Sequence, residues 1–122
     1  MKSRLSVLLA VGLGLAILSG CSKHKSSDAA FARKVIDAVY AGSLSPLRGS
    51  MTPQMQATTD AMFAPAGKML NERFGAAKNL EFKSAGVVQG YDQEIWTVVA
   101  ERGSYDMRLV FAKDGKLAGV WF

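Results

Sequence analysis

The sequence is poor in the residues that build metal sites, disulfides and nucleophile–base pairs. Its 122 residues include one cysteine, Cys21, and one histidine, His24. A chain with a single cysteine cannot form an internal disulfide, and its Cys and His side chains do not suffice for a zinc site. It also has no glycine-rich phosphate loop and no Gly-x-Ser-x-Gly nucleophile motif. We therefore predict no metal and no cofactor, and we expect His24 to be a solvated spacer residue.

A strong excess of one charge sign is also missing from most of the chain. The sequence has 15 Lys and Arg residues against 10 Asp and Glu residues. Four of the basic residues precede Asp28, which leaves 11 basic groups against all 10 acidic ones from Asp28 onward. A nearly neutral domain lacks the broad positive field that gathers phosphates, so we expect no nucleic-acid partner.

Residues 1–20 are typical of an export signal. Lys2 and Arg4 form a short positive segment, and an uncharged run rich in Leu, Val, Ala and Gly follows from Leu5 to Leu18. This run is too short for a comfortable membrane-spanning helix, which needs about 20 apolar residues. The pattern therefore predicts a signal peptide that is removed.

The four residues "LSGC", from Leu18 to Cys21, resemble a bacterial lipobox. The resemblance implies that the thiol of Cys21 carries diacylglycerol, that the chain is cut between Gly20 and Cys21, and that the new amino terminus is acylated. Ser22 resembles the residue that directs lipoproteins of double-membraned bacteria to the outer membrane. We therefore expect residues 21–27 to be a lipidated tether at the cell envelope, facing the periplasm if the cell has two membranes. An ordinary secretory signal and an uncleaved anchor are the alternatives.

Two kinds of periodicity follow Asp28. Apolar residues recur at helical spacing up to Gly75, and they alternate with polar residues from about Leu80. Residues 28–122 are therefore predicted to form one α+β domain, with helices packed on one face of a curved antiparallel sheet of about four strands. Pro65 is expected to divide two of the helices. The expected helices are 29–41, 53–63 and 65–74, and the expected strands are 79–90, 94–101, 104–112 and 117–122.

The turn signals predict how the strands pair. If Asp114–Gly115 is the turn of the last hairpin, Leu109 lies opposite Val120 and Phe111 lies opposite Ala118. These pairs place alternate side chains of both strands on a common face.

A turn centred on Gly103 would then set the pairing of the two middle strands. That pairing places two tryptophans on the outer face of the sheet, which is more apolar surface than a solvated face requires. We expect a partly covered face or an interface with a second copy or another protein. The candidate interface residues are Trp96, Arg108 and Trp121.

The segment "YDMRLVFAKDGKLAGVWF", from Tyr105 to Phe122, resembles the closing hairpin of bacterial domains in the nuclear transport factor 2-like (cystatin-like) superfamily. The resemblance implies a helical half that closes a cone-shaped space over a curved sheet. It also implies frequent homodimers through the outer face of the sheet. Enzymes of this superfamily use a polar His, Asp or Tyr group inside the cone, and that pattern is missing here.

Two functions fit these observations. The first is a non-catalytic module, anchored to the membrane through lipid as a monomer or a dimer, that holds a small apolar ligand between the helices and the sheet or docks another envelope protein. The second is a small enzyme of the same superfamily that uses a carboxylate or a tyrosine in the cone. We favour the first, because few polar side chains are expected on the helix-facing side of the sheet. The candidate pocket residues are Tyr91, Tyr105, Met69 and Phe74.

Overall fold

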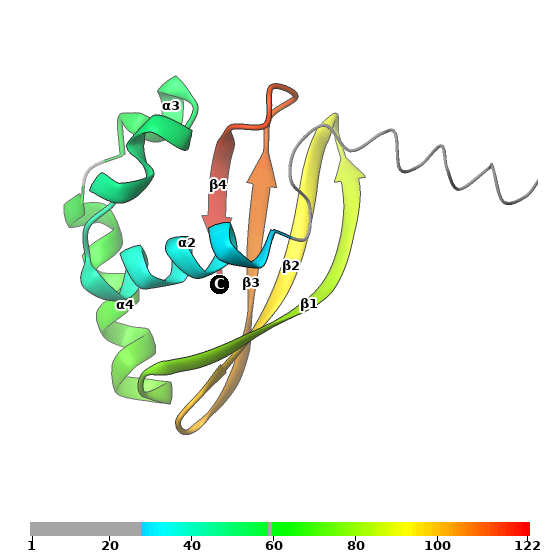
Figure 1. The fold of residues 1–122 in the computed structure, drawn as a ribbon. Helices are drawn as coiled ribbons and strands as arrows, with labels where there is room; N and C mark the ends of the chain where they lie inside the picture. The colour runs from blue at the N-terminus through cyan, green and yellow to red at the C-terminus, as the bar shows by residue number, and fades with distance from the viewer. Residues whose placement is uncertain (1–27, 59) are drawn as a thin grey trace, which may run out of the picture.

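The computed structural model describes residues 28–58 and 60–122, in which helices precede a four-stranded antiparallel sheet (Figure 1). The elements are α2 (Ala29–Ala41), the 3-10 helix η1 (Ser45–Ser50), α3 (Pro53–Gln56), α4 (Asp60–Phe74), β1 (Ala77–Val88), β2 (Tyr91–Ala100), β3 (Gly103–Phe111) and β4 (Leu117–Trp121). The strands lie in the order β1-β2-β3-β4, so β1 and β4 are edges and the sheet is not closed. The predicted α+β class is confirmed.

Helix α2 crosses one face of the sheet, which we call the inner face, and the opposite side is the outer face (Figure 1). The helix begins where Oδ1 of Asp28 accepts a hydrogen bond from the backbone N of Phe31 at 3.1 Å. It ends at Gly42, which has a left-handed φ of 72°. Its buried side faces the core, which is made by residues that include Val35, Ile36, Val39, Leu44, Leu47, Met51, Met107 and Leu109.

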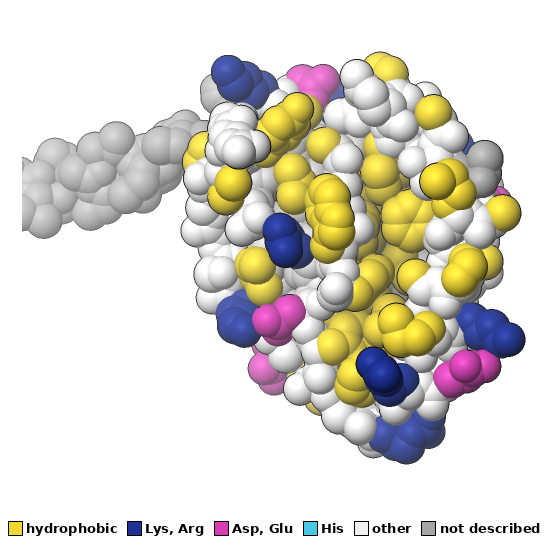
Figure 2. All heavy atoms as spheres, turned by 180° about the vertical axis from the view of Figure 1, so that it is seen from behind, with side chains coloured by type: hydrophobic (Ala, Val, Ile, Leu, Met, Phe, Trp, Pro, Cys, Tyr) yellow, Lys and Arg dark blue, Asp and Glu magenta, His cyan; other side chains and the backbone are white. Residues whose placement is uncertain are grey.

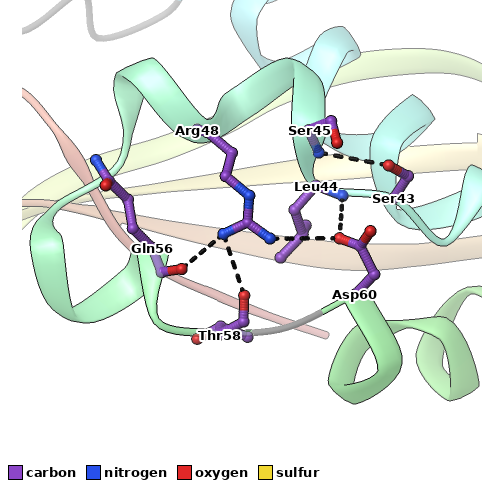
Figure 3. Close-up of polar contacts among 7 residues, drawn as sticks. All are labelled: Ser43, Leu44, Ser45, Arg48, Gln56, Thr58 and Asp60. Carbon is purple, nitrogen blue, oxygen red and sulfur yellow. Dashed lines mark hydrogen bonds and ion pairs between the residues drawn. The ribbon is translucent and has the colours of Figure 1, made fainter.

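Arg48 fixes the break between α3 and α4 (Figure 3). Its Nη1 donates to the carbonyl oxygen of Gln56 at 2.6 Å and to that of Thr58 at 3.3 Å. Its Nη2 lies 3.6 Å from Oδ1 of Asp60, the first residue of α4. The guanidinium thus binds carbonyl groups that the end of a helix leaves without intrahelical partners. Arg48 belongs to η1, so nothing in the sequence of α3 itself indicates that the helix ends before α4.

Pro65 lies inside α4 and does not begin a helix. The predicted boundary between helices 53–63 and 65–74 is therefore wrong. A proline lacks its own N–H donor, which removes one backbone hydrogen bond from the helix. Contacts of the first turn hold α4 in place, because Oδ1 of Asp60 also accepts from the backbone N of Leu44 at 2.8 Å (Figure 3).

Helices α2 and α4 cross closely at Gly67, where α4 has no room for a side chain. A Cβ on Gly67 would overlap the carbonyl oxygen of Val39 and would lie 3.3 Å from Cα of Tyr40. Near the end of α2, a Cβ on Gly42 would lie 3.5 Å from Cβ of Ala64. The missing side chain at residue 67 therefore lets the two backbones approach closely.

The turn between β2 and β3 consists of Glu101 and Arg102 and is not centred on Gly103. Trp96 consequently lies opposite Met107. This register differs from the predicted one by three residues, and an odd shift turns every side chain of β2 to the other face relative to β3. Trp96, which was predicted on the outer face, is only 2% exposed and belongs to the core.

The carboxyl end of α4 holds this turn in place. The backbone N of Arg102 donates to the carbonyl oxygen of Phe74 at 2.7 Å, and its Nη2 donates to that of Glu72 at 2.8 Å. Oε1 of Glu101 accepts from the backbone N of Ala76 at 3.1 Å. The register of the middle strands is therefore set by a helix, and the turn sequence alone did not predict it.

The last hairpin follows the predicted register at first and then departs from it. Leu109 lies opposite Val120, as predicted. An irregularity between Val110 and Phe111 then places Phe111 opposite Leu117, where the sequence predicted Ala118. A bulge of this kind turns the following side chain to the other face. Leu117 is therefore fully buried in the core.

We expect Gly67→Ala to lower the free energy of unfolding by about 2 kcal/mol, because the added methyl group meets backbone atoms that cannot rotate away. This loss corresponds to a melting temperature roughly 10 °C lower for a domain of this size. Thermal unfolding followed by circular dichroism measures the change. The matched control is Gly49→Ala, because a Cβ on Gly49 has no atom within 4 Å. Equal melting temperatures for the two variants would contradict the close crossing.

Candidate functional site

Two of the three predicted interface residues meet on the outer face of the sheet. Arg108 in β3 lies directly opposite Trp121 in β4. Its Cζ is 5.8 Å from the centroid of the indole ring, which is the geometry of a cation–π contact. Trp121 is 51% exposed, whereas Trp96 lies on the inner face. The interface proposal therefore keeps Arg108 and Trp121 and loses Trp96.

Gly119 makes room for the indole ring of Trp121. The two residues lie two positions apart in β4, so their side chains point to the same face. A Cβ on Gly119 would overlap the six-membered part of the indole ring. The ring therefore lies over the backbone of Gly119, and the short pattern Gly-Val-Trp is the sequence signal for this arrangement.

A hollow of about 390 Å³ lies beside this tryptophan on the outer face. Seen from behind, the molecule has a hollowed face along which hydrophobic side chains gather (Figure 2). The floor consists of small or branched apolar side chains, and two aromatic rings, one amide group and the hydroxyl groups of Thr52 and Tyr91 complete the lining. We call this site the outer pocket, and its lining residues are Thr52, Gln54, Tyr91, Val110, Ala112, Ala118 and Trp121.

The helical half of the chain supplies the polar part of the outer pocket. The backbone N of Thr52 donates to the carbonyl oxygen of Leu117 at 3.0 Å, and Met51 bridges Leu117 in parallel. This contact holds the start of α3 against the edge of β4, so Thr52 and Gln54 reach the pocket. Sequence reasoning did not identify either residue. They lie far from β4 in the chain, and no local pattern signals the contact.

The neighbouring part of the outer face is polar. Nζ of Lys83 lies 2.7 Å from Oδ2 of Asp106, and Oγ1 of Thr97 donates to the other carboxylate oxygen at 3.2 Å. The hydrogen bond from Lys83 lowers the pKa of Asp106. Because this pair is exposed, its contribution to stability is small. The apolar character of the outer face is therefore concentrated around the outer pocket.

Of the four residues predicted to line a pocket between helices and sheet, only Phe74 and Tyr105 come together. The rings of Phe74 and Tyr105 pack with centroids 4.8 Å apart. Tyr91 starts β2, and Tyr105 lies opposite Val98, seven positions further along that strand, so the two tyrosines are about 20 Å apart. Met69 is an exposed residue of α4. Tyr91 instead lines the outer pocket.

Tyr40 and Tyr105 form a short hydrogen-bond chain. The hydroxyl of Tyr40 lies 2.8 Å from the carbonyl oxygen of Gly75 and 2.8 Å from the hydroxyl of Tyr105. A carbonyl only accepts, so Tyr40 donates its single proton to Gly75 and Tyr105 donates to Tyr40. Burial, and next the hydrogen bond to Tyr40, raise the pKa of Tyr105 well above its ordinary value.

Glu94 is a buried acidic side chain that the sequence did not single out as a candidate site residue. It lies on the inner face, where its Oε1 accepts a hydrogen bond from Nε1 of Trp96 at 2.9 Å. The predicted register had turned this part of β2 to the outer face, so its burial was missed. A buried carboxylate on the inner face is the type of group that the enzyme alternative requires.

The described residues, 28–58 and 60–122, contain no group of three or more His, Cys, Asp or Glu side chains placed to hold a metal ion. No helix in this same part of the chain combines the length and the apolar character needed to span a bilayer. Gly20, Cys21 and His24 lie outside the described residues.

No protein-family model, curated protein or solved structure matches the chain. The resemblance of Tyr105–Phe122 to the nuclear transport factor 2-like superfamily accordingly rests on the sequence alone.

In alkaline solution, we expect the free energy of unfolding of Tyr105→Phe to fall less steeply with pH than that of the wild type. The pKa of Tyr105 is raised in the folded state, so its contribution is fully present below pH about 10 and is lost as the pH rises beyond that value. The wild-type free energy of unfolding should fall between pH 10 and 12 by at most about 1.4 kcal/mol per pH unit more than that of the variant. Urea unfolding at several pH values measures the slopes. Tyr91→Phe is the control, and a slope changed equally by both variants would contradict the assignment.

Proposed function

We propose that the protein is a lipid-anchored binding module of the bacterial envelope that holds a small apolar or aromatic ligand in the outer pocket. The observation that carries this proposal is the pocket itself, whose volume of about 390 Å³ falls in the range of small-molecule sites. Its apolar floor suits a hydrophobic ligand, and the rings of Tyr91 and Trp121 offer surfaces for stacking.

Polar groups at the pocket would orient such a ligand. The amide of Gln54 can both donate and accept a hydrogen bond. Arg108 lies against the ring of Trp121, which places a positive charge at one side of the site. The site therefore suits a flat, mainly apolar molecule with one polar or anionic substituent.

The envelope location rests on the leader and on "LSGC". Diacylglycerol on the thiol of Cys21 would supply two acyl chains, and acylation of the amino terminus created by cleavage behind Gly20 would supply a third. More than one chain is needed for stable anchoring. The order of helices and strands is compatible with a nuclear transport factor 2-like domain, whose members pair through the outer face. A homodimer through Arg108 and Trp121 is therefore the competing use of the same surface.

We expect N-phenyl-1-naphthylamine, an apolar fluorescent probe, to bind the protein at the outer pocket. Trp121→Ala should weaken binding about tenfold or more, which corresponds to a loss of 1.4 kcal/mol. Gly119→Ala should also weaken it, because the added Cβ displaces the indole ring. A fluorescence titration measures the dissociation constants.

The control for this titration is Met62→Ala, since Met62 is an exposed side chain of α4 that does not line the pocket. Equal binding by all variants would contradict the pocket assignment. Light scattering of the same samples shows whether the surface is occupied by a second copy, because Trp121→Ala would then convert a dimer to a monomer.

We expect the mature protein to begin at Cys21 and to carry diacylglycerol on its thiol and an acyl chain on its amino terminus. Mass spectrometry of material from a bacterial membrane fraction measures this directly. Cys21→Ser removes the thiol and should leave a chain that carries no diacylglycerol. A full-length chain with an unmodified Cys21 would contradict the anchoring proposal.

A further inference from the structure

The hairpin formed by β1 and β2 ends in an exposed tip that is uncharged from Ser84 through the turn to Tyr91, and Asp92, opposite Val87, is the next residue. The eight residues from Ser84 to Tyr91 contain no Asp, Glu, Lys or Arg, although such residues make up 20% of the chain. All eight are exposed, and the tip carries Val87, which is 69% exposed, and Val88, which is 49% exposed. A solvated hairpin tip ordinarily carries polar side chains.

The apolar side chains of this tip point to both faces of the hairpin. Val87 and Val88 are consecutive in β1, so one side chain lies on each face. Tyr91 lies opposite Val88 across the turn, which is closed by Gln89 and Gly90, both with positive φ. Contact with a flat protein surface would call for apolar residues on one face only. A tip that is apolar on both faces fits an environment that surrounds it.

The tip lies close to the point where the anchored segment joins the domain. The ring of Phe31, in the first turn of α2, packs 5.9 Å from the ring of Phe111. Phe111 lies opposite Asp92, and Asp92 lies opposite Val87. Two strand spacings of about 4.8 Å therefore place Val87 roughly 10 Å from Phe111.

The tether limits how far the domain can move from the membrane. Six residues, 22–27, separate Cys21 from Asp28. Seven residue steps therefore join Cys21 to Asp28, and they span at most about 25 Å even when fully extended. An acylated Cys21 would thus keep the bilayer surface within reach of the tip.

We propose that the tip of the β1–β2 hairpin inserts Val87 and Val88 into the interface of the same bilayer that holds the lipid on Cys21. This inference rests on the proposed lipid anchor. Tyr91 then lies at headgroup level, where aromatic residues with a polar end are enriched. The turn between β3 and β4 lies at the same end of the sheet (Figure 1). It carries Lys113, Asp114 and Lys116, whose net positive charge suits an anionic lipid surface.

The test uses the full, acylated chain with a single environment-sensitive label. Gln89→Cys supplies a free thiol at the tip for a nitrobenzoxadiazole probe, because Cys21 is blocked by its thioether in the acylated protein. Ser104→Cys is the matched control, since Ser104 is exposed and lies at the opposite end of the sheet. Both labelled proteins are reconstituted in vesicles of phosphatidylethanolamine and phosphatidylglycerol.

We expect the probe at residue 89 to show blue-shifted fluorescence that spin-labelled lipids quench. The probe at residue 104 should show the emission of a probe in water. Adding Val87→Thr and Val88→Thr keeps the branched shape of both side chains and removes apolar surface. This change should lower the quenching at residue 89 at least about twofold. Unchanged melting temperatures in detergent verify that the variants are folded.

Each other outcome overturns the inference for a distinguishable reason. Protein that floats with vesicles while both probes stay water-like retains the anchor and rules out insertion of the tip. Protein that does not float and shows an unmodified Cys21 rules out the anchor, and the insertion with it. A blue shift at residue 89 that rises with protein concentration and resists quenching by lipid assigns the tip to a second copy.

Discussion

The contact between the β2–β3 turn and the carboxyl end of α4 decides which side chains reach each face of the sheet. Arg102 donates to the carbonyl oxygens of Phe74 and Glu72, and this contact fixes Glu101 and Arg102 as the two turn residues. Since a shift by one residue exchanges the two faces of a strand, this contact determines that Trp96 fills the core. Trp121 is then the tryptophan that remains on the outer face, and the outer pocket forms beside it.

Helix α4 also positions the helical segments that reach the outer pocket. Helix α4 is held against α2 at Gly67, where the backbones approach each other, and its first turn is tied to η1 by Arg48. Because η1 and α3 are fixed in this way, Thr52 lies against the edge of β4 and Gln54 reaches the outer pocket. The pocket is therefore a property of the whole domain, although its floor belongs to the sheet.

Local signals in the sequence predict the elements better than their arrangement. Asp28 and Gly42 mark the ends of α2, and Asp114–Gly115 marks the last hairpin, because each acts on its own neighbours in the chain. The break before α4 and the register of β2 depend on Arg48 and Arg102, whose partners lie in other elements. The same reason explains the candidate site: Arg108 and Trp121 meet across one predicted hairpin, whereas the position of Trp96 required a register that only the packed helix supplies.

Tyr91 links the outer pocket to the hairpin tip. Its ring lines the pocket, and it directly follows the turn whose other side carries Val88. If the tip enters the bilayer interface, the pocket lies at the lipid surface, and its ligand can enter from the membrane without crossing water. An apolar molecule is far more concentrated in a bilayer than in the surrounding water, because transfer of apolar surface out of water is favourable. Under the same condition, a short lipidated tether would keep the pocket where such a ligand is abundant. Lengthening the tether would separate these effects, because the pocket would remain intact while its access to the lipid phase declined.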